Sequence, residues 1–214
     1  MYSLVMKDFR LLKKTLLFVV IYTVAMTIMQ PLPPAATASI VGWLLILNAN
    51  HFDEKNRSDM FLNSLPVSRK QIVSAKYASF FAFGLLSVGA SAIVSWAMLW
   101  FVAPDDFQVV QWQDFVIVIS SVMLAGAVFY PLYYKFGGQY VRIAMLGLLF
   151  LGMISANIIQ WLVTQRFAGT IGGVLQLLQS TSLPVMMLYL AAFTCIVTLL
   201  SWKLSTVIYQ KKDF

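Results

Sequence analysis

The residue types that most often do chemistry are scarce in this chain. It has one histidine, His51, and one cysteine, Cys195, in 214 residues. Asp53 and Glu54 are neighbours, and adjacent residues of a helix point about 100° apart, so this pair suits solvation or salt bridges better than shared acid–base work. These residues make neither a set of metal ligands nor a nucleophile with its base. We therefore expect no catalytic site and no metal site in this chain.

The hydrophilic stretch that contains Asp53 and Glu54, residues 51–76, also has an apolar cluster. The cluster consists of Met60, Phe61, Leu62 and Leu65. These residues fit one side of a short helix, which Pro66 would end because proline disfavours a helical residue before it. Exposed apolar clusters usually mark a contact with another molecule. The pattern predicts a docking helix; the alternative is that these side chains lie against the bilayer surface.

Two further residues of this stretch indicate where the next helix begins. Ser68 and Gln71 have the spacing of a capping box, in which each side chain accepts a hydrogen bond from the other residue's backbone N–H. The next helix should therefore start at about residue 68, before the uncharged stretch that begins at Tyr77.

Long uncharged stretches position these residues. The chain is 60% hydrophobic and 11% charged, with a mean hydropathy of +0.81, whereas a soluble domain is about 25% charged. A membrane-spanning helix needs about 20 mostly apolar residues. The stretches are 15–50, 77–102, 115–134, 143–165 and 183–202, and the first is divided by Pro31, Pro33 and Pro34. We expect an all-α membrane protein with six transmembrane helices in a single domain, residues 1–214.

The basic residues indicate the orientation, because Lys and Arg in short loops stay on the cytoplasmic side. Of the 15 Lys and Arg residues, all but Arg166 fall on alternate loops. Both termini are therefore expected on the cytoplasmic side of the membrane. The net charge of +7 follows these membrane edges, so membrane lipids are expected partners and nucleic acid is not.

Two segments outside the spans have patterns of their own. Residues 1–14 place apolar side chains at helical spacing, which predicts an amphipathic elbow helix in the membrane interface or, alternatively, only a charged start that fixes topology. Residues 166–182 are interrupted by glycines and are expected to be an external segment.

Few polar residues lie within the spans. Ser87, Ser91 and Ser95 form one stripe, which favours close helix packing over contact with a substrate. Asn48, Ser91 and Asn157 are the candidates for lining a transport pathway. No charged residue lies at the centre of a span, which disfavours an ion relay. The chain also has no GxxxxGK[ST] motif, so it cannot hold ATP phosphates in a P-loop.

Three motifs resemble those of ABC-2 permeases of ATP-binding-cassette transporters, in particular the small six-span bacterial branch that includes phenol-soluble-modulin exporter permeases. They are Lys7-Asp8-Phe9, the pattern from Asp53-Glu54-Lys55 through Ser64-Leu65-Pro66-Val67-Ser68-Arg69 to Lys76, and Pro131-Leu132-Tyr133-Tyr134-Lys135-Phe136-Gly137. The likeness runs over the whole chain, and the loop pattern is its most specific part.

This resemblance implies a function for residues 51–76. In the family, the corresponding loop is a coupling helix that sits in a groove of a separate ATPase. The implied coupling residues are Asp53, Glu54, Arg57, Asp59, Phe61, Leu62, Ser64, Leu65, Pro66 and Arg69, with Phe61, Leu62 and Leu65 as buried anchors. ATP and Mg would be bound by the ATPase, and this chain would bind no cofactor.

The resemblance further implies export of amphipathic or hydrophobic substrates, peptides above all, by two permease subunits, identical or homologous. Two alternatives stay open at this point. One is a receptor or immunity protein that works without an ATPase, and the other is the substrate-binding subunit of a vitamin uptake transporter.

Overall fold

The computed structural model describes residues 13–29, 33–55, 68–101, 108–138, 140–141, 143–144, 146–147 and 182–211. The part of the chain that it describes contains five helices and no strand, which confirms the all-α class. The helices are α2 (Lys13–Met29), α3 (Pro34–Lys55), α5 (Arg69–Phe101), α6 (Trp112–Phe136) and α9 (Leu183–Gln210).

Four of these helices, α3, α5, α6 and α9, are long and apolar enough to cross a membrane. The predicted first span is α2, which has 17 residues and is shorter than the others. The predicted fifth span, 143–165, lies mostly outside the described residues, as do the elbow helix and the external segment. Multi-pass insertion therefore rests on four described helices, and the total of six stays a prediction.

Local sequence signals explain where the helices begin. Pro34 is the first residue of α3, where proline is tolerated because its missing N–H has no intrahelical partner. The Ser68 N–H donates to Gln71 Oε1 (3.1 Å) and the Gln71 N–H donates to Ser68 Oγ (3.3 Å). The predicted capping box is thus confirmed, and α5 starts eight residues before Tyr77, at Arg69.

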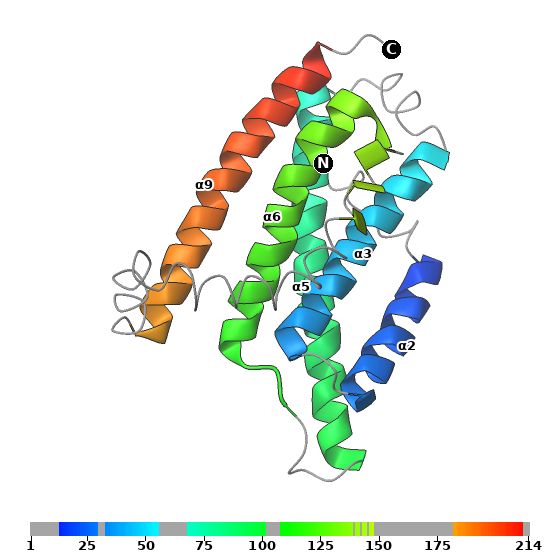
Figure 1. The fold of residues 1–214 in the computed structure, drawn as a ribbon, viewed down its shortest axis with the longest axis vertical. Coiled ribbons are helices and arrows are strands. Elements are labelled where there is room, and N and C mark those ends of the chain that lie inside the picture. The colour runs from blue at the N-terminus through cyan, green and yellow to red at the C-terminus, as the bar shows by residue number, and fades with distance from the viewer. Residues whose placement is uncertain are drawn as a thin grey trace, which may run out of the picture.

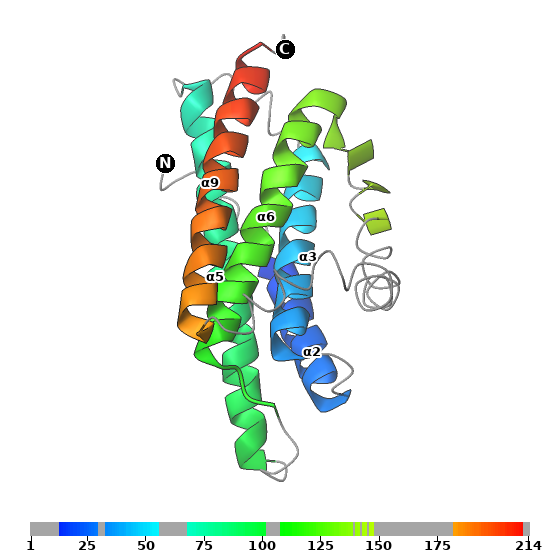
Figure 2. The same ribbon diagram turned by 60° about the vertical axis from the view of Figure 1, so that its left-hand side comes forward.

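The helices form an elongated bundle, with α2 at its edge beside α3 (Figure 1). The helices α3, α6 and α9 run in the same direction and α5 runs in the opposite one, and α6 and α9 lie side by side (Figure 2). Contacts at two levels agree with this: Ser201 Oγ donates to the Ala127 carbonyl oxygen (2.5 Å), and nearer both C-termini the rings of Tyr134 and Tyr209 lie 4.8 Å apart.

Aromatic rings and small residues fill the interior. Phe80 of α5 stacks on Tyr130 of α6 with ring centroids 4.5 Å apart, directly beside Gly126. The stripe of Ser87, Ser91 and Ser95 is buried, as close packing requires. Small residues at these positions let α5 approach its neighbours.

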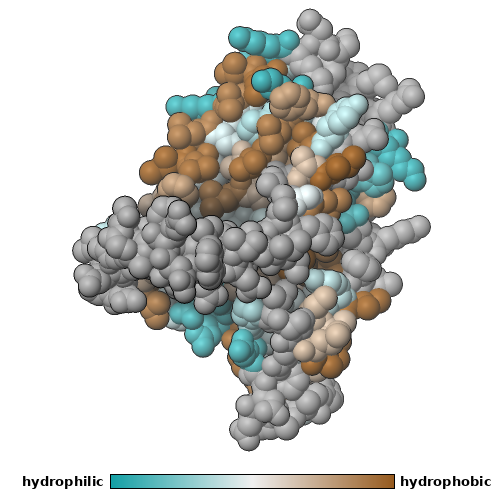
Figure 3. Space-filling view, in the orientation of Figure 1, coloured by the Kyte–Doolittle hydropathy of each residue, from teal (hydrophilic) through white to brown (hydrophobic). Residues whose placement is uncertain are grey.

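The two ends of the bundle differ in composition. Lys55, Arg69, Lys135 and Lys211 lie at the end where α3, α6 and α9 finish and α5 begins, at the top of Figure 1. Exposed indole rings mark the opposite end, at Trp96, Trp100 and Trp112. Apolar side chains cover much of the surface over α9 in Figure 3. Basic and aromatic edges around an apolar belt are typical of a membrane-spanning bundle.

Candidate functional site

The predicted coupling segment connects α3 to α5 at the basic end of the bundle. Of its predicted residues, the structure describes Asp53 and Glu54 near the end of α3 and Arg69 at the start of α5. The others, Arg57, Asp59, Phe61, Leu62, Ser64, Leu65 and Pro66, lie outside the described residues. Because α3 continues to Lys55 and α5 begins at Arg69, these helices occupy both ends of the stretch 51–76.

Asp53 faces the inside of the bundle rather than the solvent. Its side chain is 4% exposed and forms an ion pair with Lys76 of α5, whose side chain is 12% exposed. This pair joins the end of α3 to α5, two turns beyond the start of α5. The sequence predicted that the Asp53 carboxylate is solvated or forms a salt bridge. In the structure it forms a salt bridge, and that salt bridge is buried.

Glu54, the next residue, packs against the end of α6. The helix α6 stops at Gly137, which has φ +86° and donates its N–H to the Tyr133 carbonyl oxygen (3.0 Å). A Cβ atom at Gly138 would overlap the Glu54 carboxylate and crowd Tyr133. The two glycines therefore let the chain leave α6 close against α3.

Arg69 attaches the other side of the segment to the last helix. Its Nη1 donates to the carbonyl oxygens of Gln210 (2.8 Å) and Tyr209 (3.3 Å) at the C-terminal end of α9. Carbonyl oxygens in the last turn of a helix can accept such hydrogen bonds, and a cation there also interacts favourably with the helix dipole. The predicted coupling segment is thus flanked by the end of α3, which contacts α5 and α6, and by Arg69, which contacts α9.

A buried polar and aromatic cluster lies behind these attachments. The Tyr130 hydroxyl donates to Asn50 Oδ1 (3.4 Å), and the Tyr77 hydroxyl lies 2.7 Å from Ser201 Oγ and 2.9 Å from Ser205 Oγ. These contacts connect α3 with α6 and α5 with α9. The end of the bundle behind the predicted coupling segment is thus a packed block of these four helices.

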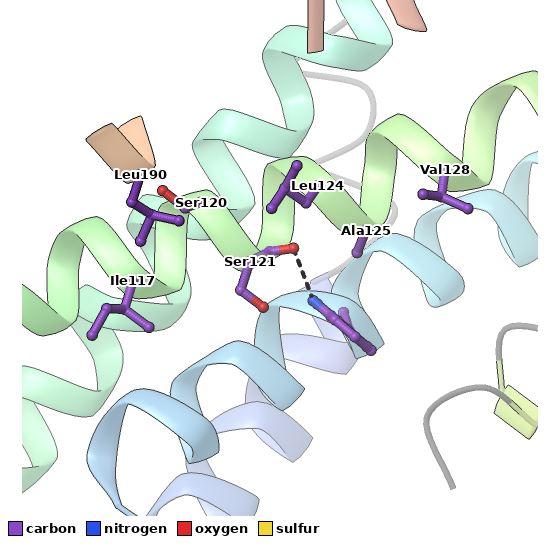
Figure 4. A pocket seen from close by; sticks show the side chains of 8 residues that line it. Ile117, Ser120, Ser121, Leu124, Ala125, Val128 and Leu190 are labelled. Carbon is purple, nitrogen blue, oxygen red and sulfur yellow. Dashed lines mark hydrogen bonds between the residues drawn. The ribbon is translucent and has the colours of Figure 1, made fainter. Parts of the chain in front are cut away.

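A second feature is an apolar cavity of about 480 Å³ beside α6 (Figure 4). It is lined by Trp43, Ile117, Ser120, Ser121, Leu124, Ala125, Val128 and Leu190. The Trp43 Nε1–H donates to the Ser121 carbonyl oxygen (3.3 Å), so the indole of α3 is held against α6. The cavity is largely open to the outside of the bundle, and its lining is almost entirely apolar.

The predicted pathway residues do not line this cavity. Ser91 is buried in the bundle, and Asn48 donates its side-chain N–H to the Leu44 carbonyl oxygen (2.9 Å) of its own helix. Asn157 lies outside the described residues. A pathway function for these three residues stays a prediction.

The comparison with known protein families decides the class of this protein. The family described as ABC-2 family transporter protein matches residues 3–210. This chain belongs to the ABC-2 transporter family. No curated protein and no solved structure matches it. The protein is therefore a membrane permease subunit of an ABC transporter, a class that works with an ATPase partner and often as a dimer.

The sequence of this ABC-2 permease did not identify Lys76 as the partner of Asp53. A signal was present: Lys76 shares one helix face with Ile72, Val73 and Phe80, which are all buried. A lysine within such an apolar stripe indicates a buried partner, because an unpaired buried charge is costly. The sequence could not identify Asp53 as that partner, because the spacing of residues along one helix does not indicate which other helix packs against it.

Arg69→Ala should weaken the attachment of the start of α5 to the end of α9 in this permease. We expect about 1 kcal/mol lower stability, the usual value of a cation at a helix C-terminus, and faster hydrogen exchange in peptides from the end of α9. Arg69→Lys should restore part of the protection, because it keeps the charge. Lys55→Ala, which removes an exposed cation at the same end, is the control. Unchanged exchange in Arg69→Ala would contradict the capping function.

Proposed function

We propose that this ABC-2 permease couples ATP hydrolysis by a separate ATPase subunit to the export of amphipathic or hydrophobic substrates, with peptides as the leading class. The observation that most supports coupling is the attachment of both sides of residues 56–67. Asp53 pairs with Lys76 on one side, and Arg69 binds the end of α9 on the other. A force on this segment would reach α3, α5 and α9 together.

In this proposal the ATPase, with its ATP and Mg, receives Phe61, Leu62 and Leu65 as anchors. Closure of two ATPases would move the coupling segments of two permease subunits, identical or homologous, as parts of rigid bodies. Glu54, Arg57, Asp59 and Ser64 would lie at the rim of the contact, and Pro66 would end the docking helix. Asp53 would act from inside the bundle, because its side chain faces Lys76.

The direction of the helices supports six spans and cytoplasmic termini. Because α6 and α9 run in the same direction, a chain that crosses the membrane in both must return between them. Residues 143–165 are the apolar stretch available for that crossing. The basic residues at the shared end of α3, α6 and α9 would then face the cytoplasm.

The cavity and the spans support an apolar or amphipathic substrate. The cavity beside α6 is almost entirely apolar, and the predicted spans have no charged residue at their centres. Such surfaces fit the hydrophobic side of a peptide or lipid better than an ion or a sugar. Export, rather than uptake, follows from the resemblance to exporter permeases.

The test is purification of the tagged full-length protein from its host in mild detergent, followed by mass spectrometry of the proteins that accompany it. We expect a P-loop ATPase. Leu62→Ala/Leu65→Ala should reduce its recovery at least about tenfold, because buried anchors dominate the binding energy of an interface.

A matched control is Val185→Ala/Leu188→Ala, which truncates two exposed apolar side chains of α9 near the opposite end and should leave recovery unchanged. If no ATPase accompanies the intact wild-type protein, the coupling proposal fails, and the ATPase-independent receptor becomes the better reading. A preformed vitamin site that binds tightly without an ATPase would instead favour the uptake subunit.

A further inference from the structure

A basic and aromatic cluster lies between α5 and α9, at the end of the bundle where α9 finishes. Lys70 Nζ lies 5.2 Å from the centroid of the Trp202 ring. The Trp202 Nε1–H donates to Ser74 Oγ (3.0 Å), one turn further along α5. The indole is therefore held by α5, with one lysine above its ring and Lys203 next to it in the chain.

Lys203 has an unusual position for a lysine. It lies on the exposed face of α9 among apolar side chains that are about half exposed or more. They are Ile196, Leu199, Leu200, Leu204 and Val207. Lys203 is itself exposed, and it precedes the last residue of α9 by seven positions, which is about 10 Å along a helix. Its ammonium group therefore extends from an apolar, membrane-facing surface just below the bundle end.

The described residues supply no acidic partner for this lysine. Their acidic residues at this end are Asp53 and Glu54, both on α3, and Asp53 pairs with Lys76. The helix α9 packs against α6 and α5. Arg69 adds a third cation beside the end of α9. This corner thus has several positive charges above an apolar surface.

We propose that Lys70, Trp202 and Lys203 form a binding site for the headgroup of an anionic phospholipid. The phosphate would lie between the two ammonium groups, and the acyl chains would lie along the exposed apolar side chains of α9 below them. A neutral lipid would bring no counter-charge to either cation. A second protein copy on this face would bury Lys203 against apolar atoms at a high desolvation cost.

The test uses the full-length protein in nanodiscs of mixed phosphatidylglycerol and phosphatidylcholine. In one preparation the phosphatidylglycerol is brominated near the glycerol end of its acyl chains, and in the other the phosphatidylcholine is brominated there. Both preparations have the same overall lipid composition. The fluorescence of Trp202 is obtained by subtracting the fluorescence of Trp202→Phe from that of the wild type. We expect brominated phosphatidylglycerol to quench this signal more than brominated phosphatidylcholine does at the same mole fraction.

Lys70→Gln and Lys203→Gln should each reduce the preference about fivefold, the contribution expected for one basic residue at an anionic membrane surface, and the double variant should abolish it. Lys55→Gln/Lys135→Gln, which removes two exposed lysines at the same end from α3 and α6, should keep it. Equal quenching by both lipids in the wild type would overturn the proposal. Two further results would overturn it. The first is an absence of quenching, which would show that protein covers the face. The second is that Lys55→Gln/Lys135→Gln reduces the preference as much as Lys70→Gln/Lys203→Gln does.

Discussion

Lys76→Met should lower the free energy of unfolding by about 3–5 kcal/mol, because it leaves the carboxylate of Asp53 buried without its partner. The Asp53 side chain is 4% exposed and that of Lys76 12%, so water replaces little of the lost interaction. Methionine keeps most of the length of the lysine side chain, so packing changes less than charge. Titration with a denaturing detergent would measure the loss.

The double variant Asp53→Leu/Lys76→Met separates the charge from the packing. It removes both ions, and it should regain most of the lost stability, because an apolar pair can replace a buried ion pair with little cost. Lys55→Met, an exposed lysine of the same helix as Asp53, should change stability by less than about 0.5 kcal/mol. If Lys76→Met were as mild as Lys55→Met, the ion pair would not stabilise the bundle.

The double variant also tests whether the pair matters for coupling. If Asp53→Leu/Lys76→Met folds but loses ATPase activity that responds to transport, the pair transmits movement between α3 and α5. If it folds and transports normally, the pair only holds the two helices together. This distinction follows from the position of Asp53 inside the bundle, beside the segment proposed to bind the ATPase.

Gly126→Val should destabilise the bundle by about 1–3 kcal/mol, the usual cost of an overpacked core. A Cβ atom at position 126 would overlap the ring of Phe80. That ring is 1% exposed and stacks on Tyr130, 4.5 Å away, so it has no free space into which to move. The thermal unfolding midpoint in detergent would fall accordingly.

Gly89→Ala is the matched control, because the methyl group that it adds to a helical glycine of α5 would meet no side chain and no neighbouring helix within 4 Å. Its midpoint should stay the same or rise, since alanine favours a helix over glycine by up to about 1 kcal/mol. A second control, Phe80→Leu/Gly126→Val, removes the ring that clashes and should recover part of the loss. Equal effects of Gly126→Val and Gly89→Ala would disprove the close approach of α5 and α6.

The ends of several elements could be predicted from local residues. Ser68 and Gln71 identified the start of α5, and the structure has both hydrogen bonds of that capping box. The prolines after the first apolar run separated α2 from α3. These signals succeed because they act within one turn of chain, where the partners are fixed by sequence spacing.

The partners of the charged residues could not be predicted in the same way. The resemblance implied that Arg69 contacts the ATPase. In the structure, its guanidinium donates to the Tyr209 carbonyl oxygen at the end of α9, and Tyr209 follows Arg69 by 140 residues in the sequence. The interaction depends on α5 and α9 lying side by side, which no local pattern reports. The coupling function of Arg69 stays a proposal, and the structure adds its contact with the last helix, α9.

The sequence by itself determined the membrane class and the all-α fold, because hydropathy and charge position act on each segment separately. The family match over residues 3–210 agrees with the class that the loop motifs implied. Only the tertiary structure decided which helices neighbour one another, that Asp53 pairs with Lys76, and that Trp43 and Leu190 share a cavity. Those contacts arise from packing between segments distant in sequence, and many helix arrangements would bury the same apolar stripes equally well.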